Sequence, residues 1–267
     1  MDIKRITSAL LGFPIVVLVL ITGNKYLVDL VVTFFAMLGL HEYFNAVSKE
    51  CKPVRWIGYL FALLIGIMHI LPMALYLKIL LISIPTLLLI LFLTIIVTDM
   101  KINFKDICYT LFGTLYIVMF TGFIPFIYGM EDGKYVIWFL LTTSWGTDIF
   151  AYIFGKKYGK HKFSKISPKK SIEGCIAGIA GAVILTLIFA CGMNTIFNLN
   201  YSYSHLIIIA TLLSVIGQIG DFSASTIKRY VEIKDFSNLI PGHGGIIDRI
   251  DSLIFIAPFA YILLGLL

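Results

Sequence analysis

The sequence predicts an all-α, polytopic integral membrane protein with about nine transmembrane helices. Its mean hydropathy is +0.96 over 267 residues. Only 13% of the residues are charged, whereas soluble domains average about a quarter. Apolar runs long enough to cross about 30 Å of hydrocarbon recur along the chain. These runs do not alternate between apolar and polar residues, which argues against a membrane β-barrel.

Nine apolar runs are expected to cross the membrane: roughly 6–23, 26–45, 56–73, 76–97, 106–128, 134–154, 173–192, 204–222 and 251–267. The first run follows a basic start but lacks a small-x-small cleavage site. We therefore expect a membrane helix there rather than a signal peptide. Pro72 and Pro85 leave the division of residues 56–97 open to another choice.

The basic residues predict the topology of these spans. With the N-terminus inside, 18 of the 21 lysines and arginines fall in cytoplasmic segments, which is a strong positive-inside signal. The N-terminus is then expected in the cytoplasm and the C-terminus on the opposite side. The net charge of +6 would lie mainly on one face and attract anionic lipid headgroups. The expected location is the inner or plasma membrane of the cell.

Polar residues are distributed unequally between the two halves of the chain. Residues 1–130 are expected to be a transmembrane scaffold with possible dimer contacts, and residues 131–267 to carry the site. The four cysteines are scattered singly, so neither a disulfide framework nor a zinc site is predicted. The chemistry is expected in the cytoplasmic half of the last four spans.

The first polar cluster lies near the end of the span predicted at 134–154. Asp148, Tyr152 and Gly155 share one helix face. An aspartate at the centre of a bilayer costs roughly 2.5–3.5 kcal/mol, so Asp148 is expected to face a partner or a wet cavity. A plain ion pair between helices is the alternative to a functional carboxylate.

The second cluster is the basic loop "GKKYGKHKFSKISPKKSIEG", residues 155–174. Ser167 and Pro168 suit an N-cap and a first-turn proline, which would place Lys169 and Lys170 beside an anion-binding helix start. Contact with nucleic acid is rejected, because the loop joins two membrane spans. Three glycines that follow are expected to permit close helix packing: Gly174, Gly178 and Gly181.

The third cluster ends the span predicted at 204–222. Asp221, Ser225 and Lys228 follow at i, i+4 and i+7, so one helix face presents a carboxylate, a hydroxyl and an ammonium group. Gly217 and Gly220 leave room for another backbone or a ligand.

The fourth cluster is "PGHGGIIDRIDS", residues 241–252. Its glycines predict a turn whose backbone N–H groups can hold an anion, and the helix that follows carries carboxylates on one face. A carboxylate in a first helical turn is often only a partner of the helix dipole, but that does not explain the whole group. The candidates in this stretch are His243, Gly244, Gly245, Asp248, Arg249, Asp251 and Ser252.

Carboxylates that gather at one membrane depth need a cation among them. Oxygen ligands without paired cysteine or histidine favour Mg²⁺ or Mn²⁺, and Mg²⁺ commonly completes its shell with substrate phosphates. Neither a P-loop nor a nucleophile elbow is present in the sequence. Phosphoryl or nucleotidyl transfer with one lipid-borne substrate is therefore the expected reaction class.

The pattern "SxxKRxxxxKDxxxxxPGHGGxxDRxDS", residues 225–252, resembles the signature of the phosphatidate cytidylyltransferase (CDP-diacylglycerol synthase) family. "DxxAYxxGKKYGKHK" and "SPKKSIEG" resemble upstream elements of the same family, so the resemblance covers roughly residues 140–252. It implies that CTP and phosphatidate react to give CDP-diacylglycerol and diphosphate, with the lipid phosphate attacking the α-phosphorus of CTP.

The resemblance also implies roles for individual residues. The expected catalytic residues are Asp148, Asp221, Lys228, Asp248 and Arg249. The expected substrate- and phosphate-binding residues are Lys169, Lys170, Ser171, Ser225, Arg229, Lys234, His243, Gly244 and Gly245. The expected metal site is Asp221, Asp248, Asp251 and Ser252, holding Mg²⁺ or Mn²⁺ with a second cation nearby.

The expected partners are CTP, phosphatidate, membrane lipids and a second copy in a homodimer. A CTP-dependent lipid-alcohol kinase of the dolichol- or phytol-kinase type is an alternative that would need a base for a neutral hydroxyl. An ion-coupled transporter is a more distant alternative, since it would favour internal repeats and polar residues near mid-bilayer.

Overall fold

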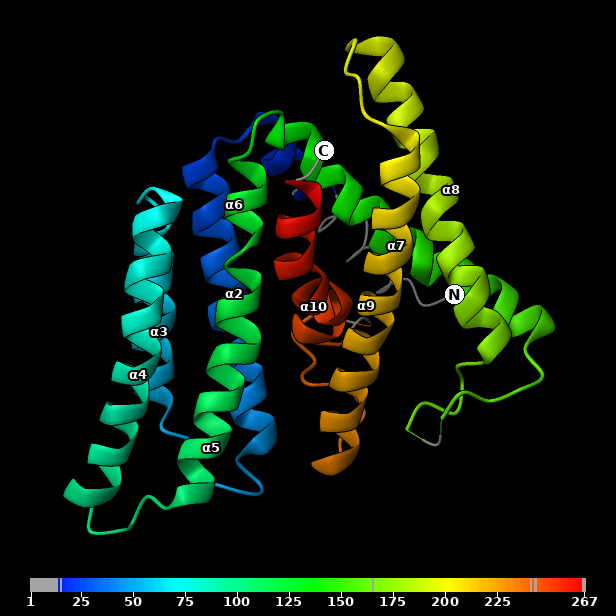
Figure 1. Ribbon diagram of the computed structural model, residues 1–267. Helices are drawn as coiled ribbons and strands as arrows, with labels where there is room; N and C mark the ends of the chain where they lie inside the picture. Colours follow the sequence, from blue (N-terminus) through cyan, green and yellow to red (C-terminus); the bar gives the residue numbers. More distant parts are fainter. Residues whose placement is uncertain (1–13, 15, 165, 241, 243, 266–267) are drawn as a thin grey trace. The chain divides into compact units, whose positions relative to one another are not determined.

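The computed structural model describes residues 14, 16–164, 166–240, 242 and 244–265, and this part of the chain is all-helical (Figure 1). The β-structure within it is confined to two isolated bridges, one between Lys162 and Ser171 and one between Ile240 and Gly244. The expected all-α class is confirmed.

The chain divides into two compact units. The first contains Met1–Phe126 and Tyr230–Arg249, and the second contains Ile127–Arg229 and Ile250–Leu267. The segment that follows the eighth predicted span thus returns to the first unit. The functional division expected at residue 130 stays a prediction.

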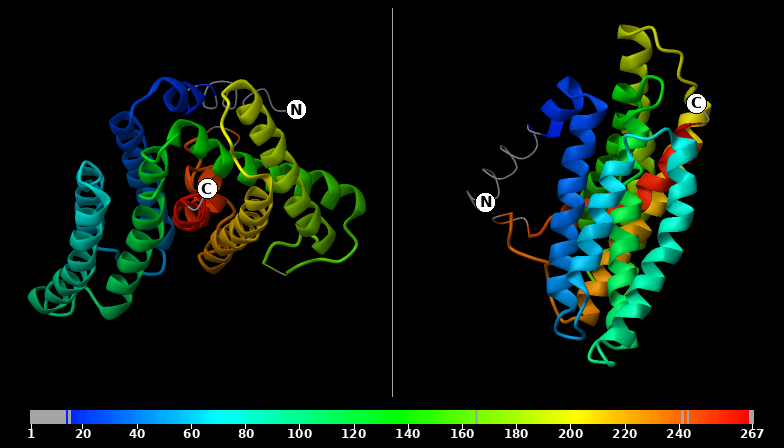
Figure 2. Two further views of the ribbon diagram at one scale, coloured as in Figure 1. Left: turned by 45° about the horizontal axis from the view of Figure 1, so that its top comes forward. Right: turned by 90° about the vertical axis from the view of Figure 1, so that its left-hand side faces the viewer.

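The helices of the first unit lie side by side in both views of Figure 2. They are α2 (Lys25–Val47), α3 (Arg55–Met68), α4 (Met73–Val97) and a segment in which α5 (Phe104–Gly113) continues directly into the π-helix η1 (Thr114–Met119). The short helix α6 (Ile124–Tyr128) follows and crosses the boundary between the units after Phe126. Asn24 caps α2 by accepting a hydrogen bond from the backbone N–H of Leu27 at 2.9 Å. Asn103 and Asp106 form a reciprocal capping box on α5.

The two prolines that left residues 56–97 open have separate positions in the structure. Pro72 is the N-cap of α4, whereas Pro85 lies inside that helix. A membrane helix tolerates an internal proline because neighbouring groups and local adjustment satisfy the freed backbone carbonyl.

The second unit is built from α7 (Gly133–Tyr158), α8 (Ile172–Ile196) and α9 (Tyr203–Tyr230), with most of α10 (Ile247–Leu264). The pairing of α7 with α8 depends on glycine. A Cβ atom on Gly178 would lie 2.9 Å from the carbonyl oxygen of Thr147, and one on Gly181 would lie 2.1 Å from the ring of Phe150. Close packing at the expected glycines is confirmed.

The start of α8 agrees with the span expected at 173–192, but the N-cap expected at Ser167 is wrong. Ser167 and Pro168 lie in a bend and turn, and the helix begins four residues after Pro168, at Ile172, with Ser171 as its N-cap. The Ser171 hydroxyl accepts a hydrogen bond from the backbone N–H of Gly174 at 3.1 Å. Glu173 also holds the preceding loop, because its carboxylate accepts hydrogen bonds from the backbone N–H groups of Lys160 and His161.

Six described segments are long and apolar enough to cross a membrane: Lys25–Val47, Ala74–Val97, Phe104–Tyr128, Gly133–Tyr158, Ile172–Ile196 and Tyr203–Tyr230. The apolar helix α3 has only 14 residues. Half of the span expected at 6–23 lies outside the described residues. The chain is therefore a multi-pass helical membrane protein, and the count of nine spans stays a prediction.

Candidate functional site

An ion pair between the ammonium group of Lys170 and the carboxylate of Asp221 links the start of α8 to α9 in the second unit. The two side chains keep 29% and 26% of their surface exposed, so both are open to solvent or to a ligand. Nζ of Lys170 also lies 4.4 Å from the ring centroid of Phe222, close enough for a cation–π contact. The sequence indicated both charged residues as candidates but not their pairing.

Asp251, on the part of α10 that belongs to the second unit, lies within the electrostatic reach of α9 and α7. Asp221, Asp148 and Lys228 all act electrostatically on Asp251. Oδ1 of Asp251 also accepts a hydrogen bond from the backbone N–H of Ser252 at 2.8 Å. We call Asp148, Lys170, Asp221, Lys228 and Asp251 the charged cluster.

Two glycines allow α9 and α10 to approach closely at the charged cluster. A Cβ atom on Gly217 would lie 2.6 Å from Cδ1 of Ile256, and one on Gly220 would lie 2.8 Å from the carbonyl oxygen of Asp251. The buried Ser252 hydroxyl lies 3.0 Å from that of Ser144 on α7. Ser252 thus ties α10 to α7 beside the charged cluster.

Asp248 belongs to the first unit and holds the glycine turn that precedes α10. Its Oδ2 atom accepts hydrogen bonds from the backbone N–H groups of Phe236 at 2.8 Å and Gly245 at 3.0 Å. Gly244 has a φ of +83°, a conformation that glycine adopts without strain. Asp248 is thus a structural anchor of Phe236 and Gly245 as well as a candidate ligand.

Glu42 on α2 is a second acidic anchor of the same turn. It was not among the residues predicted from the sequence. Its buried carboxyl group accepts hydrogen bonds from the Ser237 hydroxyl at 2.6 Å, from the Ile246 N–H at 2.9 Å and from the Ile247 N–H at 3.0 Å. A Cβ atom on Gly245 would lie 2.5 Å from Glu42. The signal was an acidic residue inside an apolar run, which usually marks a functional position.

The other candidates occupy several environments. Asp148 is exposed on α7, and the last turn of α9 carries Lys228 and the exposed Arg229. Ser225 is buried on α9. Three further basic candidates are exposed: Lys169, Lys234 and Arg249.

Four of the expected positions are not explained by exposure alone. Ser171 serves as a helix cap, and His243 lies outside the described residues. Asp221 belongs to the second unit and Asp248 to the first.

No group of three or more His, Cys, Asp or Glu side chains suited to a metal ion occurs within the residues that the structure describes. A cage made wholly of protein ligands is therefore absent from this part of the chain. Mg²⁺ commonly needs only one or two carboxylates, with substrate phosphates and water completing its shell. Asp221 and Asp251 are two carboxylates of the second unit that act on one another electrostatically.

Comparison with known proteins gives a consistent result. The model of the cytidylyltransferase family matches residues 3–267. The chain is 38% identical over 166 residues to a phosphatidate cytidylyltransferase of Bacillus subtilis, which is 61% of this chain and 60% of that protein. Similar proteins of the same name occur in Staphylococcus haemolyticus, with 38% identity over 165 residues, and in Thermotoga maritima, with 35% over 166 residues. In both of these, the match covers 61% of each chain.

Proposed function

The chain belongs to the cytidylyltransferase family, and we propose that it transfers a cytidylyl group from CTP to phosphatidate. The products are CDP-diacylglycerol and diphosphate, so the protein would serve phospholipid biosynthesis. The chain spans about three fifths of the length of the curated relatives it matches. Their shared name, phosphatidate cytidylyltransferase, supports this choice of substrates.

The observation that carries the proposal is the convergence of both charge signs in the second unit. Lys170 and Asp221 pair directly, while Asp251 lies in the fields of Asp221 and Lys228. Two substrates that both carry phosphate need cations, and a divalent ion that bridges phosphates needs carboxylates. The charged cluster offers both.

Asp221 and Asp251 would hold Mg²⁺ or Mn²⁺, with Asp248 and Ser252 as the further expected ligands and a second cation nearby. When bound, such ions neutralise phosphate charge and stabilise the attacking and leaving oxygens. The lysines of the charged cluster bind and orient phosphate groups in this proposal. A phosphate nucleophile is already anionic, so placement and charge neutralisation replace a strong general base.

The turn before α10 would carry the expected phosphate-binding residues Gly244 and Gly245, while the N–H groups of Gly245, Ile246 and Ile247 donate to Asp248 and Glu42. Glu42 and Asp248 hold this turn in shape, so they act as positioning residues for it. The remaining expected phosphate contacts are Lys169, Ser225, Arg229, Lys234, His243, Gly244, Gly245 and Arg249.

The proposed setting is the cytoplasmic face of the cell membrane. The basic loop at 155–174 lies at one end of α7 and α8, and the positive-inside rule places such loops in the cytoplasm. CTP is a water-soluble substrate, whereas phosphatidate arrives from the bilayer. A homodimer is part of the proposal as well.

Incubating the purified protein in lipid vesicles with phosphatidate and CTP labelled at the α-phosphorus tests the reaction. The expected result is labelled CDP-diacylglycerol and unlabelled diphosphate. Activity should be lost with a chelator and should return when Mg²⁺ is added. Labelled CDP, together with phosphorylation of an added lipid alcohol, would instead support the kinase alternative. Ion transport without either reaction would support a transporter.

A further inference from the structure

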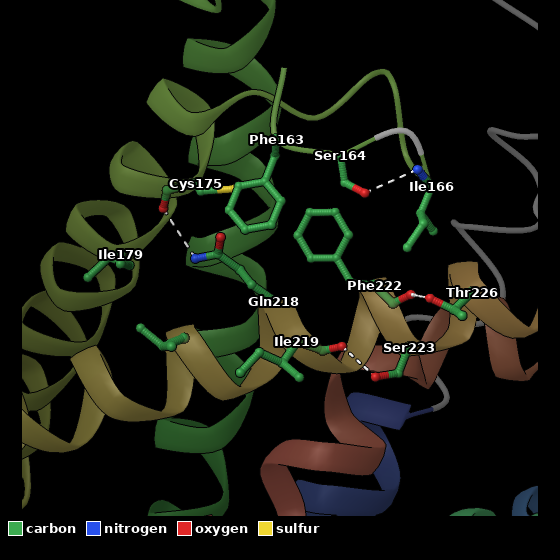
Figure 3. Close-up of a pocket in the computed structure, with 11 residues that line it drawn as sticks. Phe163, Ser164, Ile166, Cys175, Ile179, Gln218, Ile219, Phe222, Ser223 and Thr226 are labelled. Carbon is green, nitrogen blue, oxygen red and sulfur yellow. Dashed lines mark hydrogen bonds between the residues drawn. The ribbon is translucent and has the colours of Figure 1, made fainter. Parts of the chain in front are cut away.

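A pocket of about 420 Å³ lies within the second unit, beside the charged cluster (Figure 3). Phe163 and Ile166, from the loop that precedes α8, line one side of it, and α8 and α9 line the rest. Phe163 and Phe222 stack with their ring centroids 4.6 Å apart. No motif in the sequence indicated this pocket.

The lining of the pocket is apolar in character, because its polar side chains are engaged within the protein. The hydroxyl of Ser223 donates a hydrogen bond to the Ile219 carbonyl at 2.8 Å, and that of Thr226 donates to the Phe222 carbonyl at 2.8 Å. The amide group of Gln218 donates to the carbonyl of Cys175 at 3.2 Å. A cytosine ring would need donors and acceptors aimed at it, whereas a hydrocarbon chain needs only this apolar surface.

The pocket follows the axes of two candidate membrane spans. Its lining on α9 runs from Val215 to Thr226, which corresponds to about 16 Å along a helix. On α8 it includes Cys175 and Ile179, in the first turns of that helix. The pocket thus extends from the loop end of both spans toward their apolar middle, as a lipid chain does.

Cationic groups lie at the loop end of the pocket. Lys170 contacts the Phe222 ring, and Nε of Arg229 donates a hydrogen bond to the carbonyl of Ile166 at 3.4 Å. Both partners line the pocket. A ligand with an anionic phosphate at one end and hydrocarbon at the other complements this arrangement of charge.

We propose that this pocket binds one acyl chain of the phosphatidate substrate and places its phosphate beside Lys170 and Asp221. The inference rests on the proposed function and assigns a substrate subsite to it. An apolar chain that is buried here leaves the lipid headgroup at the ends of α8 and α9, next to the charged cluster.

Photocrosslinking tests chain binding without any turnover. Phosphatidate with a diazirine on one acyl chain is added to the purified protein in vesicles, without CTP, and the labelled peptides are mapped. Labelling is expected in peptides that contain Phe163, Cys175 or Ile219, and unlabelled phosphatidate should compete with it. Labelling spread evenly over exposed helix surfaces such as α4 would overturn the proposal. It would also be overturned if CTP reduced the labelling and unlabelled phosphatidate did not.

A filling substitution gives an independent test. Ile219 is 52% exposed and lines the pocket, whereas Ile208, on the same helix, is 58% exposed and is not part of the lining. Ile219→Trp should raise the KM for phosphatidate about tenfold through lost chain contacts and leave the KM for CTP unchanged. Ile208→Trp should change neither value. Equal KM values for phosphatidate in the two variants would contradict the pocket assignment.

A replacement variant and two combinations of results separate failure of the lipid site from failure of the proposed function. If Ile219→Trp does not fold, Ile219→Ala replaces it and should weaken crosslinking at residue 219 without unfolding the helix. If no CDP-diacylglycerol forms but competed crosslinking maps to the pocket, the proposed function fails and the lipid site stands. If the reaction proceeds while crosslinks map elsewhere, or while a second copy is found to cover the pocket, the inference fails alone.

Discussion

The carboxyl group of Glu42 accepts a hydrogen bond from the backbone N–H of Ile247 at 3.0 Å, across a separation of 205 residues. With its bonds to Ser237 and Ile246, it joins α2 to the start of α10. The turn that contains Gly244 and Gly245 lies between these contacts. Its shape therefore depends on a residue far from the motif in sequence.

Glu42→Ala should unfold more easily than the parent protein and lose most of its turnover. Three buried or half-buried donors lose their acceptor, which costs about 3 kcal/mol or more. Thermal unfolding in detergent and the KM for CTP measure the two effects. Glu42→Gln keeps one acceptor oxygen and should fall between the parent and the alanine variant. Glu50→Gln, which removes only an exposed pair with Lys105, should change little. A normal KM for CTP in an active Glu42→Ala protein would refute the positioning role.

Asp221→Asn should reduce turnover by at least about 100-fold, because it removes charge from the site proposed to neutralise transferring phosphates. The fold should survive, since Asn occupies the same volume. Asp248→Asn should reduce turnover to a similar extent. It should also lower the stability of the protein, because Asp248 accepts two backbone hydrogen bonds. Cytidylyl transfer and thermal unfolding are measured on both variants. Near-normal activity in either would contradict the role assigned to that residue.

Lys170→Met should raise the KM of a phosphate-bearing substrate by about 10- to 100-fold, the effect of losing a charged hydrogen bond. Steady-state kinetics with each substrate varied in turn checks this. Lys170→Arg should recover part of the loss because it restores the charge. Lys162→Met removes an exposed lysine of the same loop and should behave like the parent. Identical kinetics in Lys170→Met and Lys162→Met would leave Lys170 without a role in binding.

Gly178→Ala should destabilise the protein by about 1–3 kcal/mol, because the added methyl group would lie 2.9 Å from the Thr147 carbonyl. Gly192→Ala on the same helix meets nothing within 4 Å and should be neutral or slightly stabilising. Unfolding of both variants in mixed detergent micelles gives the difference. Equal stabilities would argue against close packing of α7 on α8.

Cysteine accessibility tests the proposed topology. In a background without native cysteines, Lys160→Cys, in the loop before α8, should react with a membrane-impermeant maleimide only from the cytoplasmic side. Asn200→Cys, in the connection after α8, should react only from the opposite side. Labelling of both positions from one side would show that α8 does not cross the membrane and would overturn the orientation.

Hydropathy predicted the helices better than it predicted their ends. The span expected at 204–222 is part of α9, Tyr203–Tyr230, because hydropathy detects the edge of the apolar region, whereas the backbone hydrogen bonds continue into the polar turns. Ser167 fitted a local capping pattern as well as Ser171 did. In the structure α8 starts at Ile172, and the Glu173 carboxylate in its first turn binds the backbone of the preceding loop. A local capping pattern cannot predict this contact with the loop.

The candidate site was predictable in composition but not in its pairings. The sequence named Lys170, Asp221 and Asp251, and the structure brings them into one charged cluster of the second unit. The role of Glu42 could not be predicted because its donors are mostly backbone N–H groups, which every residue type except proline carries. The apolar pocket escaped notice because packed loops and helices create it, rather than any motif.

The long separation between Glu42 and its donors also matters while the protein is being made. At about 5–20 residues per second, a ribosome needs roughly 10 to 40 s to add the 205 residues between Glu42 and Ile247. During this interval α2 enters the bilayer with a carboxyl group whose donors have not yet been synthesised. A nascent chain that ends before Ser237 therefore holds the Glu42 carboxyl group without the three donors that it has in the complete fold.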